Sequence, residues 1–238
     1  MRQTDFGRTR KVVELAKTDV NSLVYAVYLW MSVGLCITGG IAWYAGTSNL
    51  VNEIILNMPL FIGLMVGELA LVMILATCVT RLSSFACTAI FLLYSALNGI
   101  TLSVIFLTYT KTSIVSTFFI CASTFAVCSI YGWFTKKDLT SMGSFMFMGL
   151  IGLIIAMFVN MFLRSPAMQY LISAVGIIVF VGLTAFDTQK IKEMAMTMPN
   201  DIGGGAIRKG AIMGALTLYL DFINLFLFFL RFFGISKD

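Results

Sequence analysis

The stretch AIMGALTLYLDFINLFLFFL, residues 211–230, decides the fold. About 20 apolar residues in a helix are enough to cross a bilayer core of roughly 30 Å. The only charged side chain in this run is Asp221, which has apolar residues on both sides. An acid at mid-bilayer costs about 2.5–3.5 kcal/mol on insertion scales, so Asp221 calls for an explanation.

The composition of the whole chain also indicates a membrane protein. Of the 238 residues, 59% are hydrophobic and 11% are charged, and the mean hydropathy is +0.96. Soluble domains are about 45–50% apolar and about 25% charged, which excludes a soluble globular fold. The absence of histidine excludes histidine-based zinc sites, Ser-His and Cys-His catalysis and imidazole pH switches. The net charge of +5 forms no basic stripe interleaved with aromatic residues, so we expect no nucleic-acid partner.

Six other apolar segments precede the last one. They cover residues 23–45, 58–80, 84–109, 113–134, 142–163 and 167–194, and the last covers 207–233. The sequence therefore predicts an all-α membrane protein, a bundle of seven transmembrane helices over residues 22–234. A polar N-terminal tail (residues 1–21) precedes the bundle, and a short C-terminal tail (residues 235–238) follows it. Because the apolar run behind the N-terminal tail is too long for a signal-peptide core, we expect the tail to be retained.

Lysine and arginine residues indicate the orientation, because they are enriched on the cytoplasmic side. With the N-terminus inside, twelve of the 16 basic residues lie in the cytoplasm. The four that lie outside are Lys111, Arg164, Arg231 and Lys237. We therefore expect a cytoplasmic N-terminus and, after seven crossings, an external C-terminus. The alternative is a re-entrant last segment, but residues 207–233 are long enough to cross.

Three acids lie inside predicted spans, namely Glu68, Asp187 and Asp221, whereas Glu53 and Asp138 lie near span ends. Two of these acids share a helix face with mostly small or polar residues. The face of Asp221 includes Gly210, Gly214, Thr217 and Asn224, and the face of Asp187 includes Ser173, Gly176, Phe180 and Thr184. Small residues let helices approach closely, and polar residues find partners across the contact. We therefore expect these two faces to look inward, toward each other.

The two aspartates lie at similar depths. At 1.5 Å per residue, Asp187 is about 10 Å inside its span and Asp221 about 15 Å inside an antiparallel one. Two carboxyl groups that meet in a low-dielectric site cannot both ionise cheaply, so we expect them to share a proton and titrate as a pair. The alternative is a structural pair that stays protonated and hydrogen-bonded.

Four other polar residues have two interpretations each. Glu68 either lines a pore or makes a structural hydrogen bond. Asn98 fits a hydrogen bond between helices better than an ion contact. Arg81 either reaches from the cytoplasmic end of the second span toward Asp187 or serves as an orientation signal. Lys190, three residues after Asp187, either snorkels to the membrane surface or pairs with that carboxylate.

Three motifs resemble those of the Bax inhibitor (transmembrane Bax inhibitor motif) family. LYLDFINLF (residues 218–226), running on to LRFFG (230–234), resembles the family's last-helix signature. AFDTQKI (185–191) resembles the sixth-helix motif, and NGITLS (98–103) resembles the third helix. The likeness covers roughly residues 21–234 and is greatest to bacterial members. It implies a seventh helix at the centre of the bundle and a place in the bacterial inner membrane.

The resemblance also implies a function, a pH-sensitive calcium leak channel. Asp187 and Asp221 would be the proton sensor and gate and would contact calcium transiently, and Arg81 would latch onto one of them. Further candidate pore and ion contacts are Glu68, Asn98 and Asn224. Calcium is then a permeant ion, and we expect no catalytic residue and no resident cofactor.

Two other functions stay open. A bacterial branch of the family restrains a membrane-bound AAA protease, so the chain is alternatively an interaction protein that modulates such a protease or a stress or cell-death pathway. Residues 1–21 would then be its point of contact. An intramembrane aspartyl protease also needs two intramembrane aspartates, but its GxGD signature is missing, because Leu218-Tyr219-Leu220 precedes Asp221.

Overall fold

A computed structural model describes residues 3–48, 50–197 and 203–237 of the chain. The described residues are almost entirely helical and include no β-strand. The helices are α1 (Gln3–Thr47), α2 (Leu50–Leu56), α3 (Met58–Cys78), α4 (Ser84–Leu102), α5 (Ile105–Thr108), α6 (Lys111–Phe134), α7 (Thr140–Leu163), α8 (Pro166–Thr197) and α9 (Gly204–Phe233). Residues 1–2 of the predicted N-terminal tail and residue 238 of the C-terminal tail lie outside the described residues.

Seven helical segments are long and apolar enough to cross a membrane. They are Ser22–Thr47, Met58–Cys78, Ser84–Thr108, Lys111–Phe134, Thr140–Leu163, Pro166–Thr197 and Gly204–Phe233. Each coincides with a predicted span to within a few residues. The prediction of an all-α, seven-span bundle is therefore confirmed.

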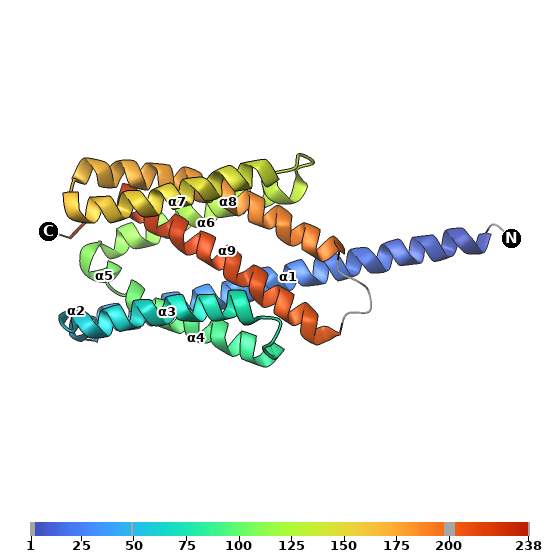
Figure 1. Ribbon diagram of the computed structural model, residues 1–238, viewed down its shortest axis with the longest axis horizontal. Coiled ribbons are helices and arrows are strands. Elements are labelled where there is room, and N and C mark those ends of the chain that lie inside the picture. Colours follow the sequence, from blue (N-terminus) through green and yellow to red (C-terminus); the bar gives the residue numbers. More distant parts are fainter. Residues whose placement is uncertain (1–2, 49, 198–202, 238) are drawn as a thin grey trace.

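Helix α9 lies at the centre of this bundle. It packs against α1 and α4 on one side and against α6 and α8 on the other (Figure 1). Most of its residues are buried, whereas α3 and α7 bury few. The central seventh helix is confirmed. Since α9 runs as one continuous helix along the bundle and does not turn back, the re-entrant alternative is not seen (Figure 1).

The peripheral helices α3 and α7 carry exposed apolar side chains. Met65 and Leu69 on α3, and Phe158 and Phe162 on α7, are all more than half exposed. A soluble protein would not tolerate an apolar surface of this extent. In a bilayer these side chains contact lipid tails, so the outer faces of the bundle match a membrane environment.

Two glycines allow α8 to lie close to its neighbours. Gly176 on α8 faces the ring of Phe228 on α9, and Gly132 on α6 faces the backbone oxygen of Ala185 on α8. A Cβ atom at either position would overlap these atoms. Close packing of α8 with α9 is what positions the polar face of each helix against the other.

The N-terminal tail is more regular than its polar composition suggests. Helix α1 begins at Gln3 and continues without a break into the first span. Its N-terminal part projects past the other helices (Figure 1). Residues 3–21 contain no proline and a single glycine, so few residues that interrupt a helix stand in the way of its extension beyond the apolar segment.

The C-terminal tail is attached to the junction between α5 and α6. The backbone N–H of Thr110 donates to the carbonyl oxygen of Ile235 at 3.1 Å, and that of Lys237 donates to Thr108 at 2.9 Å. The N–H of Ile235 donates to the hydroxyl of Ser113 at 2.9 Å. The end of the central helix is therefore held to the start of α6.

Candidate functional site

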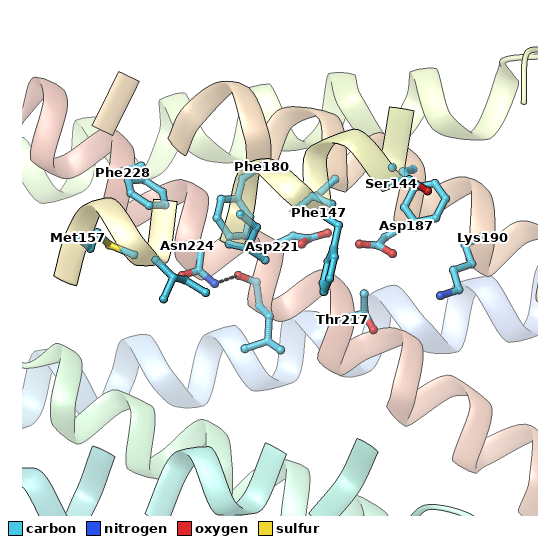
Figure 2. Close-up of a pocket in the computed structure, with 16 residues that line it drawn as sticks. Ser144, Phe147, Met157, Phe180, Asp187, Lys190, Thr217, Asp221, Asn224 and Phe228 are labelled. Carbon is cyan, nitrogen blue, oxygen red and sulfur yellow. Dashed lines mark hydrogen bonds between the residues drawn. The ribbon is translucent and has the colours of Figure 1, made fainter. Parts of the chain in front are cut away.

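Asp187 and Asp221 line one cavity of about 740 Å³ between α7, α8 and α9 (Figure 2). Most of the lining side chains are apolar. The polar ones besides the two aspartates are Ser144, Lys190, Thr217 and Asn224. The polar faces of the sixth and seventh spans therefore bound the same space.

The two carboxyl groups point toward each other (Figure 2) and interact directly, side chain to side chain. Asp221 is only 5% exposed, and Asp187 is partly buried. The Oδ2 atom of Asp221 is buried and has no hydrogen-bond partner among the described residues. A buried acceptor left unsatisfied costs about 1–3 kcal/mol, and more when it is charged. A proton held between the two carboxyl groups would remove this cost, so a shared proton stays the prediction that fits the geometry.

The cation beside Asp187 is Lys190 rather than Arg81. Lys190 lines the cavity, interacts electrostatically with Asp187, and lies with its Nζ 5.9 Å from the centre of the Phe186 ring. Arg81 is exposed in the turn after α3, outside the cavity lining, and makes no ion pair with Asp187. Helix α3 packs against α4, across the bundle from α7 and α8 (Figure 1). The latch implied for Arg81 is therefore not formed in this structure.

Glu68 and Asn98 lie away from this cavity. The hydroxyl of Thr101 donates to Oε1 of Glu68 at 2.8 Å and joins α3 to α4. Nδ2 of Asn98 donates to the hydroxyl of Tyr94 at 3.0 Å, a bond within α4. The structural interpretation of Glu68 matches its contact. For Asn98 the structure gives this bond within one helix, and the expected bond between helices stays a prediction.

Thr217 and Asn224 add oxygen atoms to the cavity. Nδ2 of Asn224 donates to the carbonyl of Leu220 at 2.8 Å, which leaves its Oδ1 as an acceptor. The hydroxyl of Thr217 donates to the carbonyl of Met213 at 3.1 Å and keeps free lone pairs. Even if both oxygens of each carboxyl group took part, these atoms would reach only the lower limit of the roughly six to eight oxygens of a tight calcium site. The described residues hold no group of three or more histidine, cysteine or acidic side chains suited to a metal.

The wall that α7 contributes was not predicted. It includes Gly143, Ser144 and Phe147. Helix α7 has no acid and is apolar on all sides, so its inward face gives no signal by periodicity. The adjacent small residues Gly143 and Ser144 were the one available clue. The ring of Phe186 occupies the space where a Cβ of Gly143 would lie.

A second cavity, of about 470 Å³, lies where α7 ends and α8 begins. Met157 lines both cavities. Nη1 of Arg231, which lines the second cavity, lies 3.9 Å from the sulfur of Met157. Met157 and Arg231 therefore lie between the aspartate cavity and the far end of the bundle.

A family model described as "Inhibitor of apoptosis-promoting Bax1" matches residues 20–238, which include both aspartates. The chain belongs to the Bax inhibitor family. The resemblance of the three motifs is thereby confirmed.

The relatives of this Bax inhibitor family member match it over nearly the whole chain. The inner membrane protein YbhL of Escherichia coli strain K12 is 46% identical over 230 residues, which cover 96% of this chain and 97% of that protein. The protein RP147 of Rickettsia prowazekii is 43% identical over 237 residues, 98% of this chain and 99% of that one. A protein of Borreliella burgdorferi is 44% identical over 219 residues, 92% and 94% of the two chains. The chain is thus a multi-pass membrane protein of the Bax inhibitor family with an inner membrane homologue.

Proposed function

We propose that this protein is a passive cation leak channel that passes calcium and is gated by protonation of Asp187 and Asp221. The observation that carries the proposal is the meeting of two carboxyl groups in a cavity inside the membrane-spanning bundle. Ionisable residues inside membrane spans commonly mark ion or proton pathways. The resemblance to the Bax inhibitor family implies the same ion and the same pair.

The pair can gate because its charge changes with pH. With one shared proton the two carboxyl groups attract, which holds α8 and α9 together. When both are ionised, two unit charges about 4 Å apart repel by about 4 kcal/mol at an effective dielectric constant of about 20. An energy of this size can shift a helix such as α9 between two packed positions.

The small number of oxygen atoms favours permeation over storage. A calcium ion in the cavity would contact the two carboxylates and, in passing, the oxygens of Thr217 and Asn224. Conduction requires a site that an ion can also leave, so incomplete coordination suits a leak. Calcium is then the transported ion, and we propose no resident cofactor.

For the location we propose the bacterial inner membrane with a cytoplasmic N-terminus. The name of the YbhL relative and the distribution of basic residues support this. Lys190 and the cavity mouth beside it would then face the cytoplasm. The partners are the lipid bilayer, calcium and protons, and we propose no nucleic-acid partner.

Calcium flux in liposomes tests the proposal. The purified full-length chain is reconstituted with a calcium dye inside, and initial flux is measured from about pH 5 to about pH 8. We expect flux to change with pH in the native protein. In Asp187→Asn and Asp221→Asn the pair cannot gain or lose its proton in the same way, so the pH response should be lost.

Asp138→Asn is the matched control. Asp138 is an exposed acid in the loop between α6 and α7, outside the cavity. The same chemical change there should leave both flux and pH response as in the native protein. Unchanged flux and pH response in both cavity variants would refute the proposal.

The second candidate function is that of an interaction protein for a membrane-bound AAA protease or a stress pathway. The projection of α1 favours it, since the N-terminal part of this helix extends past the other helices (Figure 1). Deletion of residues 1–21 separates the two functions. Loss of a co-purifying protease with unchanged calcium flux would support the interaction role, whereas absence of any such protease from the native preparation would count against it.

We further propose that the chain is not an enzyme. Two intramembrane aspartates are the minimum for an aspartyl protease, but the sequence around Asp221 lacks the GxGD signature. Incubation of the reconstituted protein with a model transmembrane substrate should give no cleavage. Cleavage that Asp187→Asn and Asp221→Asn each abolish would overturn this proposal.

A further inference from the structure

The second cavity gathers cationic and hydrogen-bond-donating side chains at the end of the bundle where the C-terminus lies (Figure 1). The polar residues that line it are Asn160, Arg164, Gln169, Ser173 and Arg231. No aspartate or glutamate lines it among the residues that the structure describes. Two guanidinium groups therefore border one space without a carboxylate to neutralise them.

The turn between α7 and α8 holds one of these arginines in place. Arg164 has a left-handed backbone with φ 49° and ψ 35°, and its N–H donates to the carbonyl of Asn160 at 2.8 Å. Glycine or asparagine is the usual residue at such a helix end, and non-glycine residues in this conformation are concentrated at functional sites. The side-chain oxygen of Asn160 accepts from the N–H of Ser165 at 3.1 Å, which leaves Nδ2 of Asn160 as a donor.

Among the described residues, the guanidinium of Arg231 lies 3.9 Å from the sulfur of Met157 and 5.8 Å from the centre of the Phe228 ring, and it interacts electrostatically with Tyr109. None of these partners is a carboxylate. Neither Arg231 nor Arg164 makes an ion pair within the described part of the chain. Arginine presents five N–H donors in a planar fork that matches phosphate oxygens, so an anion with several oxygens is the complementary ligand.

The rest of the cavity wall is apolar and belongs to the membrane spans. Met157, Met161 and Ile172 contribute this wall beside the arginines. Arg164 and Arg231 each lie at the end of a span, at the level of lipid headgroups. The cavity thus combines a cationic rim with an apolar wall, as a phospholipid requires for its phosphate and the upper part of its acyl chains.

We propose that this cavity binds the headgroup phosphate of an anionic phospholipid of the surrounding membrane, between Arg164 and Arg231. Asn160 and Gln169 supply further donors to the phosphate or to a headgroup hydroxyl. The proposal does not depend on calcium conduction, because the aspartate pair lies in the other cavity.

Lipid titration of the purified full-length chain tests the proposal. Native mass spectrometry and thermal unfolding in detergent are followed with phosphatidylglycerol, phosphatidylcholine and inorganic phosphate as separate ligands. The variants are Arg164→Gln, Arg231→Gln, the double variant and the charge-conserving Arg231→Lys. Lys111→Gln is the matched control, since Lys111 is another exposed cation at this end of the bundle and does not line the cavity.

We expect one phosphatidylglycerol per chain, bound roughly fivefold more weakly after each Arg→Gln change and about thirtyfold more weakly after both. Lys111→Gln should bind as the native protein does, and Arg231→Lys should retain part of the affinity. Unfolding temperatures without lipid identify any variant that fails to fold. In that case the test is the phosphatidylglycerol affinity of Arg231→Lys compared with that of Arg231→Gln. Equal phosphatidylglycerol binding in the native and double-variant proteins would overturn the proposal, as would equally tight binding of phosphatidylcholine or of inorganic phosphate alone.

Discussion

The hydroxyl of Tyr219 shows how single residues fix the central helix. It is buried on α9 and lies 2.7 Å from the hydroxyl of Thr38 on α1. Thr38 donates its one proton to the carbonyl of Ser95 on α4 at 2.8 Å, so Tyr219 is the donor to Thr38. One chain of hydrogen bonds therefore joins three helices two residues away from Asp221.

Because Tyr219 donates to Thr38, we expect substitutions of these two residues to lower the free energy of unfolding by different amounts. Tyr219→Phe removes a donor but leaves Thr38 bonded to Ser95, and should cost about 0.5–1.5 kcal/mol. Thr38→Val leaves the buried hydroxyl of Tyr219 without its acceptor, and should cost about 1–3 kcal/mol. Thermal unfolding in detergent should give a lower Tm for Thr38→Val. A larger loss of Tm in Tyr219→Phe would contradict Tyr219 as the donor. Tyr170→Phe, at an exposed tyrosine, is the control.

Asp138 gives a pH prediction outside the spans. Hydrogen bonds from the hydroxyl and the N–H of Thr140, at 2.6 Å and 2.9 Å, lower the pKa of Asp138 below its ordinary value of 3.8. A carboxyl group whose pKa is lowered by folding stabilises the protein above its unfolded pKa, and this contribution is lost as pH falls through the folded pKa. The Tm advantage of the native protein over Asp138→Asn should therefore shrink as pH falls below about 4. An advantage that grew in this range would contradict the assignment.

At the scale of helices, the contact between α6 and α8 depends on the missing side chain of Gly132. Gly132→Ala would place a methyl group on the backbone oxygen of Ala185, and backbone cannot rotate away as a side chain can. Overpacking of this kind costs about 1–3 kcal/mol. We expect a lower Tm and, because Ala185 lies two residues before Asp187, an altered pH response of calcium flux.

Gly152→Ala is the matched control for this change. Gly152 lies on α7, where the new methyl group would have no atom of another helix within 4 Å, and alanine is the better helix former. The Tm of Gly152→Ala should equal or slightly exceed that of the native protein. Equal losses at both glycines would show that the contact between α6 and α8 is not the cause.

For the whole molecule, the spans could be predicted because length and hydropathy determine them, whereas the central position of the seventh helix was implied by the family resemblance. The meeting of Asp187 with Asp221 follows from polar faces on two neighbouring helices. The helices beside which Arg81 and Glu68 lie could not be predicted from polar faces. Apart from Glu68, helix α3 is almost entirely apolar, and lipid and protein interior are equally apolar, so its sequence does not indicate which neighbouring helix it packs against.

The attachment of the C-terminal tail was also beyond prediction. It depends on backbone groups of Thr108 and Thr110, and backbone hydrogen bonds leave no pattern in side-chain types. The same applies to the second cavity. Arg164 and Arg231 are far apart in sequence, and by sequence alone both count only as external basic residues.

The side chain of Met157 has a consequence for the proposed leak, because this flexible thioether lines both cavities. Met157→Ala should raise calcium flux at every pH while the pH response persists, as measured in the liposome assay. Unchanged flux would show that the barrier lies elsewhere. If flux rises, rotation of this unbranched side chain would join the two cavities into one water-filled path, in addition to the proposed shift of α9. Since Arg231 contacts the same sulfur, the mix of lipids in the membrane would set the resting rate of the leak.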